Sequence, residues 1–223
     1  MRPDVVEAAD EVRDALDERL AAGVSALGLD VAAVSRVALL DFTRLLTKWN
    51  ARFNLTSVTT PLDMVTVHLL DSLAVVEAVD ARSPATLLDV GSGAGFPGIP
   101  IAIVRPRLVV RTVDAVAKKI AFQQQVRSTL KLDNLEPRHA RVEQFETDPP
   151  DVIVSRAYAP LATFVSSVDR LANDRTTLLA MKGAVQSDEL AGVPSDWRID
   201  DVRSLDVPFL GARRSLVVMT RRT

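Results

Sequence analysis

Short apolar runs alternate with amphipathic segments from residue 86 to residue 183, and this alternation constrains the fold more than any other feature. Runs rich in β-branched residues predict buried strands, and the segments between them have the apolar spacing of helices. A parallel sheet with helices on both faces accommodates this order. We therefore predict an α/β fold whose ligands bind beyond the carboxyl ends of the strands. The predicted strands are 86–90, 108–114, 151–157 and 176–183, with a weak one near 136–142, and the predicted helices are 98–106, 116–132 and 161–172.

The last forty residues contain two more runs with strand character, 197–207 and 213–222. We expect these two runs to form an antiparallel pair that closes the sheet. No internal repeat and no low-complexity segment accompanies these runs.

The first third of the chain has helical periodicity instead. Helices are predicted over 4–28, 30–50 and 61–80, the last with Pro61 at a favourable starting position. We therefore divide the chain into an N-terminal helical cap, 1–83, and a sheet domain, 84–223. The apolar stripes expected to face the core contain Val5, Val12, Leu16, Leu20 and Val24 in the first helix, and Val34, Val37, Leu40, Phe42 and Leu45 in the second.

Composition removes several classes of site. The chain has no cysteine, which excludes disulfides, thiolate metal sites and cysteine nucleophiles and fits a reducing compartment. The acid-rich N-terminus does not resemble a signal peptide, and no run approaches the roughly 18 apolar residues of a membrane span. We expect a cytoplasmic protein with no membrane partner and no metal, and we expect a monomer.

Charge is unevenly distributed, although the formal net charge is only −2. Residues 1–83 contain 8 Lys or Arg against 13 Asp or Glu, whereas residues 84–223 contain 19 against 16. An acidic front and a mildly basic body permit a local basic patch for phosphates.

Three glycines, Gly91, Gly93 and Gly95, follow the first predicted strand and precede a helix. Glycine lets a ligand approach the backbone closely, so this position is typical of a nucleotide loop. The dinucleotide fingerprint has the spacing G-x-G-x-x-G, but Phe96 stands where its third glycine belongs. Asp89 precedes the loop, and a carboxylate there is suited to the ammonium group of S-adenosylmethionine. The pattern therefore favours S-adenosylmethionine over NAD as cofactor.

Asp114 ends the second predicted strand, where an acid commonly accepts hydrogen bonds from ribose hydroxyls. Both acids also have a structural interpretation, in which Asp89 caps the loop and Asp114 caps the next helix. The spacing of the glycines favours the nucleotide interpretation and does not exclude the other.

Several stretches together resemble the ribosomal RNA small subunit methyltransferase G family, also called glucose-inhibited division protein B. They cover about residues 45–220 and read KWNARFNLTSVT, HLLDSL, LLDVGSGAGFPGIPIAIVRP, KLDNLEPRHARVEQF, VIVSRAYAPL, MKG and GARRSLVVM. The resemblance implies a class I, Rossmann-like methyltransferase sheet with a helical N-terminal extension. It also implies methyl transfer from S-adenosylmethionine to N7 of a guanine, nucleotide 527 of 16S rRNA, within the 30S subunit.

The resemblance further implies a set of cofactor contacts. Gly91 and Phe96 belong to the loop, Val142 and Glu143 are expected beside the adenine, and Arg156 lies at the mouth of the fourth strand. The family often has leucine where this chain has Phe96, and a larger apolar side chain can still cover the cofactor.

The residues themselves agree with guanine N7 as the methyl acceptor. Methylation at C5 of a pyrimidine needs a cysteine nucleophile, which the chain lacks. Methylation of an exocyclic amine usually accompanies a [DN]-P-P-aromatic turn after the fourth strand, but the DPPD at 148–151 precedes that strand and has no aromatic. Guanine N7 has a free lone pair and needs no general base, so catalysis can depend mainly on positioning.

Basic residues near the predicted strand ends are the candidates for RNA contact, and they are Lys118, Arg141, Arg156, Lys182 and Arg213. Arg156 is also the candidate catalytic residue, because it follows the fourth strand and can bind either the cofactor carboxylate or an RNA phosphate. Tyr158 can stack on an extruded base or pack in the core. We expect a structural role for His68 beside Asp71 and a surface position for His139.

Three other functions fit parts of this pattern. A methyltransferase acting on a small molecule or a protein would explain the modest basicity. An NAD-linked oxidoreductase would use the same kind of sheet, although Phe96 disfavours it. A non-catalytic RNA-binding assembly factor could retain the cofactor fold.

Overall fold

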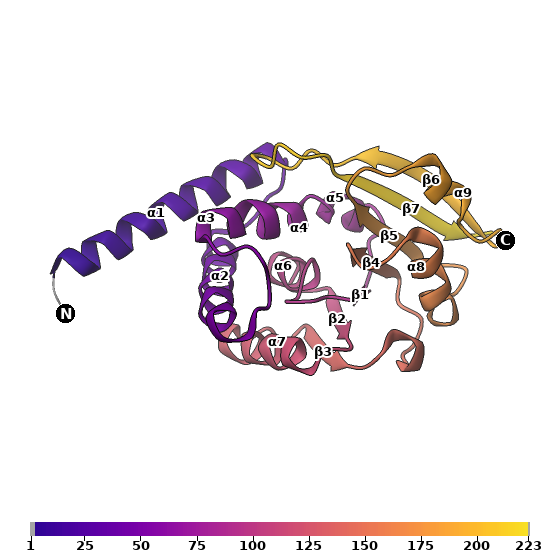
Figure 1. Cartoon of the computed structure of the whole chain (residues 1–223), viewed down its shortest axis with the longest axis horizontal. Helices are drawn as coiled ribbons and strands as arrows, with labels where there is room; N and C mark the ends of the chain where they lie inside the picture. Colours follow the sequence, from indigo (N-terminus) through magenta and orange to yellow (C-terminus); the bar gives the residue numbers. More distant parts are fainter. Residues whose placement is uncertain (1–2, 223) are drawn as a thin grey trace.

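The computed structural model describes residues 3–222, with side chains from residue 11 onward. A single seven-stranded sheet runs through the molecule in the order β3-β2-β1-β4-β5-β7-β6 (Figure 1). The first five strands are parallel, β7 is antiparallel to β5, and β6 pairs with β7 at the edge. The strands are β1 (Thr86–Val90), β2 (Val109–Asp114), β3 (Leu135–His139), β4 (Val152–Arg156), β5 (Thr177–Lys182), β6 (Trp197–Ser204) and β7 (Ser215–Arg221). Every predicted strand, including the weak one and the closing pair, is confirmed.

Helices cover both faces of the sheet, as the alternation predicted. Leu87 faces a core formed with α6 (Gly98–Val104), α7 (Ala117–Leu130) and the N-terminal helices, whereas Leu88 faces a second core with α8 (Leu161–Val168). Adjacent strand residues point to opposite faces, so one strand contributes to both cores. Two 3₁₀ turns, η2 (Val142–Gln144) and η3 (Asp169–Leu171), and the short helix α9 (Ser187–Ala191) complete the connections.

The N-terminal third is helical, as predicted, but its third segment is irregular. The long helices are α1 (Pro3–Ala26) and α2 (Ala33–Phe53). The predicted helix 61–80 is instead divided into α3 (Pro61–Asp63), the π-helical η1 (Met64–Leu70), α4 (Asp71–Leu73) and α5 (Val76–Asp80). π-helical turns are rare and often occur at functional sites. None of the described helices combines the length and apolar character that crossing a bilayer requires.

The predicted stripes are buried only in part. Leu20, Val24, Leu40 and Phe42 lie in the core, whereas Val12 is 56% exposed; Val5 lies outside the described side chains. The first half of α1 extends beyond the body of the molecule (Figure 1).

In α2 the prediction is wrong for Val34 and Val37, which are 75% and 44% exposed. Burial of Leu39, Phe42 and Leu46 fixes the rotation of the helix. At about 100° per residue, this rotation turns Val34 and Val37 away from the sheet.

The helical cap and the sheet share one hydrophobic core. The ring of Phe42 in α2 lies 5.2 Å from that of Phe96 in the glycine loop and 6.0 Å from that of Phe122 in α7. The same cluster includes Leu20 and Val218, from opposite ends of the chain. The division into domains 1–83 and 84–223 stays a prediction.

Candidate functional site

The glycine loop connects β1 to α6 and carries three positive φ angles, +65° at Gly91, +60° at Gly93 and +98° at Gly95. A Cβ at Gly91 would overlap the ring of Tyr158, and one at Gly95 would overlap Ile99. The side-chain amide of Gln123 in α7 donates to Ser92 Oγ at 2.9 Å and to the Gly93 carbonyl at 2.8 Å. The loop is therefore fixed by close packing on two sides and by a buried amide.

Asp89, near the end of β1, stabilises the glycine loop through a hydrogen bond to its backbone. It is fully buried, and its Oδ2 accepts a hydrogen bond of 2.7 Å from the Gly98 backbone N–H. Burial raises the pKa of this carboxyl to about 7, since water cannot solvate its charge. Asp89 lies outside the lining of the cavities described below. This is the loop-capping role, and a contact to the cofactor ammonium stays a prediction.

The N-terminus of α6 has no free donors for a pyrophosphate. The Gly98 N–H is bound to Asp89, the Ile99 N–H to the Gly95 carbonyl and the Ile101 N–H to the Pro97 carbonyl, while Pro100 has no N–H. Dinucleotide sites place the pyrophosphate on these donors. The structure therefore disfavours NAD for a reason that is independent of the glycine spacing.

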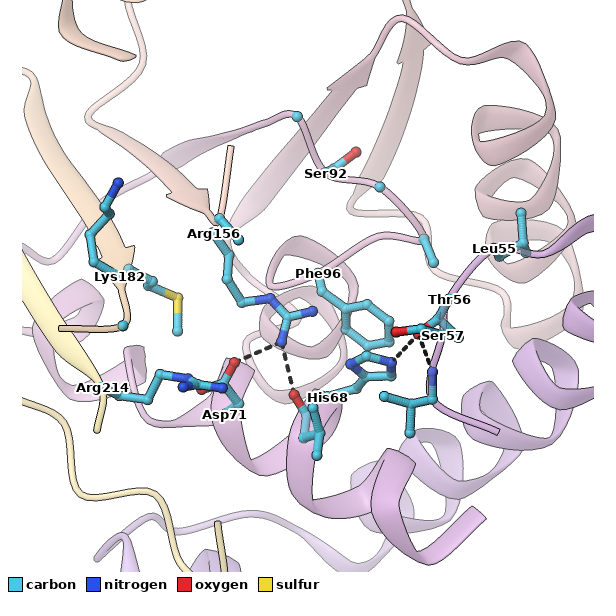
Figure 2. Close-up of a pocket in the computed structure, with 18 residues that line it drawn as sticks. Leu55, Thr56, Ser57, His68, Asp71, Ser92, Phe96, Arg156, Lys182 and Arg214 are labelled. Carbon is cyan, nitrogen blue, oxygen red and sulfur yellow. Dashed lines mark hydrogen bonds and ion pairs between the residues drawn. The ribbon is translucent and has the colours of Figure 1, made fainter. Parts of the chain in front are cut away.

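A cavity of about 440 Å³ opens at the carboxyl ends of the strands (Figure 2). It is lined by the glycine loop, the segment 55–58, the π-helical region, the ends of β4 and β5, and Arg214 just before β7. Of the predicted site residues, Gly91, Gly93, Phe96, Arg156 and Lys182 line it. Gly95 does not line it, and a Cβ at this position would meet Ile99 of α6; cofactor binding by Gly95 stays a prediction.

A second cavity, of about 380 Å³, lies beside the first and shares Gly91 and Ala157 with it. Its lining includes the predicted residues Asp114, Arg141, Val142 and Glu143, together with Tyr158. The Oδ2 of Asp114 accepts from the Gly93 N–H and its Oδ1 from the Val116 N–H, both at 2.8 Å. Each carboxylate oxygen can accept a further hydrogen bond, so Asp114 caps backbone groups and still faces the cavity.

The two cavities fit S-adenosylmethionine in their chemistry. The second offers a carboxylate for ribose hydroxyls and the apolar Val142 for an adenine. The first offers the Arg156 guanidinium for a carboxylate. The backbone at Gly91, without a Cβ, is where the two meet.

Arg156 is held on three sides. Its Nη1 donates to Asp71 Oδ2 at 2.8 Å and to the Val67 carbonyl at 3.0 Å. Its guanidinium carbon lies 4.9 Å from the centre of the Phe96 ring. The other oxygen of Asp71 accepts from Nε of Arg214 at 2.8 Å. Figure 2 shows the two arginines approaching Asp71 from different elements, β4 and the segment before β7.

His68 lies at the cavity wall and is uncharged near neutral pH. Its ring stacks on Phe96 with centroids 4.6 Å apart, and its Nε2 lies 2.7 Å from Thr56 Oγ1. Burial lowers its pKa to about 4, and the positive charge of Arg156 adds to this effect. His68 thus connects the segment 55–58 to the glycine loop, which agrees with the predicted structural role. His139 is exposed at the end of β3, as predicted.

The predicted RNA contacts do not all converge. Lys182 lines the first cavity, but its Nζ lies 2.6 Å from Glu189 and donates to the Ala159 carbonyl. Arg141 is exposed at the second cavity. Lys118 donates to the Phe53 carbonyl, and Arg213 is exposed; neither lines a cavity. RNA binding by all four stays a prediction.

The neighbour of Arg213, Arg214, lines the cavity instead. Sequence reasoning missed it because adjacent arginines in a loop cannot be distinguished before the loop conformation is known. Asp71 and Thr56 were missed as well, although both lie in the stretches HLLDSL and NLTSVT that carry the family resemblance. Within the part of the chain that the structure describes, no three His, Asp or Glu side chains gather as metal ligands.

The turn DPPD at 148–151 precedes β4, as predicted, at the amino end of the strands. Asp151 accepts hydrogen bonds of 2.9 Å from the N–H groups of Ala85 and Thr86. It therefore fastens the start of β1 and lies outside the cavity.

Comparison with known structures supports the predicted fold class. An O-methyltransferase from Bacillus cereus in complex with SAH has a TM-score of 0.54 at 13% identity, covering 82% of this chain and 91% of that one. The chain therefore has the Rossmann-like α/β fold of this O-methyltransferase, as the alternation of strands and helices predicted.

Sequence relatives are much closer. The family model of rRNA small subunit methyltransferase G matches residues 36–217. The ribosomal RNA small subunit methyltransferases G of Azoarcus sp. (strain BH72) and Methylobacillus flagellatus are 45% and 46% identical. The matches cover 91% and 93% of this chain and 95% and 99% of the relatives. The chain belongs to the ribosomal RNA small subunit methyltransferase G family.

Proposed function

We propose that this protein transfers a methyl group from S-adenosylmethionine to N7 of a guanine in 16S rRNA. The observation that carries the choice of N7 is the state of the acids and bases at the first cavity. Both oxygens of Asp71 accept from arginines, and the lowered pKa of His68 makes it a weak proton acceptor. An acceptor atom with its own lone pair needs no base, and guanine N7 is such an atom.

When bound, S-adenosylmethionine supplies an electrophilic methyl group. In the proposed arrangement Asp114 binds the ribose hydroxyls, and Val142 and Glu143 border the adenine in the second cavity. Gly91 lines both cavities, so a cofactor that occupies both would pass its backbone, and the missing Cβ leaves room for the ring of Tyr158.

Arg156 is the residue that we place at the reacting groups. Its Nη1 is bound to Asp71 and Val67, which leaves Nε and Nη2 without a partner among the described residues. Phe96 covers one face of the guanidinium, so the side chain is fixed before any ligand arrives. Such preorganisation favours catalysis by positioning, which can contribute several kcal/mol.

The position of the target, nucleotide 527, follows from the family resemblance alone. We propose that the substrate is 16S rRNA within the 30S subunit, that the enzyme acts as a monomer in the cytoplasm, and that it needs no metal. The basic residues around the two cavities support an RNA substrate, because they would neutralise backbone phosphates.

The test is methyl transfer from tritiated S-adenosylmethionine to 30S subunits from a strain that lacks this activity, followed by nucleoside analysis. We expect the label in 7-methylguanosine, and in one fragment of 16S rRNA. Label in another nucleoside would refute N7 chemistry, and label in a protein or small molecule would favour the other acceptor classes. Calorimetry with S-adenosylmethionine and NAD provides the control: binding of NAD alone would contradict the cofactor assignment.

A further inference from the structure

Arg214 has the contacts of a binding residue, although neither the glycine loop nor the family resemblance points to it as one. It precedes β7 and lines the first cavity, 143 residues from its partner Asp71. We infer that Arg214 binds a backbone phosphate of the RNA beside the target base, and that Asp71 is the residue that positions it. This inference rests on the proposed function for the identity of that base.

The first step concerns charge at the cavity. The Asp71 side chain is only 3% exposed, and one carboxylate there faces two guanidinium groups, 17% and 25% exposed. One negative charge cannot neutralise two positive ones, so the cluster keeps a net positive charge at the cavity wall (Figure 2). Such a charge is costly to keep partly buried unless an anion binds next to it.

The second step concerns donors. The Nε of Arg214 is bound to Asp71 and its Nη1 donates to the Arg213 carbonyl at 3.0 Å. Its Nη2 has no hydrogen-bond partner among the residues that the structure describes. A guanidinium fixed at Nε presents its remaining N–H groups in one plane, which matches the geometry of phosphate oxygens.

The third step separates Arg214 from the other cations of the cavity. Lys182 is paired with Glu189. Arg156 touches Phe96 of the glycine loop, which places it on the cofactor side of Asp71. Among the described residues, the Arg214 guanidinium donates hydrogen bonds to Asp71 and to the Arg213 carbonyl only, so it belongs to the side of the cluster formed by the β6–β7 connection. Two anions, the cofactor carboxylate and an RNA phosphate, would thus meet two arginines that share one carboxylate.

The experiment compares Arg214→Gln with Arg107→Gln. Both substitutions remove one positive charge, but Arg107 is exposed just before β2, at the amino ends of the strands and away from the cavity. For each protein we would measure the Kd for S-adenosylmethionine by calorimetry and the KM for 30S subunits at several salt concentrations. Thermal melting shows whether each variant is folded.

We expect Arg214→Gln to raise the KM for 30S subunits about tenfold and to leave the Kd for the cofactor unchanged within about twofold. The slope of log KM against log salt should fall by about 0.7 to 0.9, the value for one lost phosphate contact. Arg107→Gln should leave the slope and both constants unchanged. Asp71→Asn should raise both the Kd for S-adenosylmethionine and the KM for 30S subunits, because neither arginine would then be paired with a carboxylate.

A weaker cofactor affinity with an unchanged salt slope would show that Arg214 binds the cofactor carboxylate, and it would overturn the inference. If Arg214→Gln changed neither the Kd for S-adenosylmethionine nor the KM for 30S subunits, the inference would also be overturned. If Arg214→Gln does not fold, Arg214→Lys keeps the charge and the Asp71 pair but loses the planar fork, so the KM for RNA should still rise. Nucleoside analysis of the wild-type product separates the two proposals: a base other than 7-methylguanosine refutes the proposed function, while the salt slope still tests Arg214.

Discussion

Asp89 should make the stability of this protein fall as pH rises through neutrality. Its carboxyl is completely buried, one oxygen accepts from the Gly98 N–H, and the other has no partner among the described residues. Burial raises its pKa from 3.8 to about 7. Because the folded-state pKa is above the unfolded one, the folded state binds the proton more tightly. The stabilisation is complete below about pH 4 and is lost as pH rises through 7.

The magnitude follows from linkage. A shift of about three pKa units corresponds to roughly 4 kcal/mol, of which about 2.5 kcal/mol falls between pH 5 and pH 8. Asp89→Asn has no charge to bury and keeps an oxygen that can accept from Gly98. The free energy of unfolding of the variant, relative to wild type, should therefore rise by about 2.5 kcal/mol from pH 5 to pH 8.

Urea denaturation at several pH values, without cofactor, measures this difference. Asp151→Asn is the control, because the pKa of Asp151 is shifted in the opposite direction from that of Asp89. Burial tends to raise the pKa of Asp151, but hydrogen bonds from Thr86 and Ala85 outweigh it and the pKa is lowered. Its stabilisation is present above about pH 4, so Asp151→Asn should be less stable than wild type by a constant amount from pH 5 to pH 8. If the free energy of unfolding of Asp89→Asn instead changes with pH in the same way as that of the wild type, Asp89 is not a desolvated carboxyl and the structural role assigned to it in the loop is wrong.

Three further predictions concern the site and the shared core. Gly93→Asp should abolish S-adenosylmethionine binding in calorimetry, and undiminished binding would show that the loop is not the site. The new side chain has space, since only Lys119 Nζ lies within 4.0 Å of a Cβ there. Positive φ strains a non-glycine backbone by about 1 kcal/mol, so the melting temperature should fall by only about 2–4 °C. NMR should show the ring of His68 titrating with a midpoint near pH 4, and a midpoint above 6 would contradict its burial. Because the folded-state pKa is below the unfolded one, the contribution of His68 to the free energy of unfolding should decline as pH falls from 6.5 towards 4. Phe42→Ala should lower the free energy of unfolding by about 3–5 kcal/mol. Because Phe42 packs against rings of the sheet domain, the variant should still unfold in one cooperative transition, and separate unfolding of the cap would contradict a shared core.

The sheet and its order of elements could be predicted because buried strands have a characteristic pattern of residues in the local sequence. Strands enclosed by helices on both faces must be apolar along their length, as in TLLDV and VIVSR, and glycines mark the loop where the backbone needs positive φ. These patterns depend on neighbours in sequence, so no tertiary information was needed to place β1, the loop and α6.

The rotation of α2 and the course of residues 61–80 could not be predicted in this way. Val34 and Val37 have the apolarity of core residues, and only the packing of Phe42 against Phe96 and Phe122 decides which side of the helix is buried. The π-helical turn before Asp71 likewise has no sequence signal in this segment, because propensity does not distinguish it from an α-helix.

By itself, then, the sequence determined the α/β fold, the family and the loop that fits S-adenosylmethionine. Tertiary structure alone decided the electrostatics of the first cavity. Asp71, Arg156 and Arg214 come from three distant parts of the chain, and they interact only after the cap, β4 and β7 have packed together. Charge pairing and desolvation act through space over a few ångströms, so the roles of Asp71 and Arg214 and the pKa values of His68 and Asp89 depend on folded neighbours that no local pattern records.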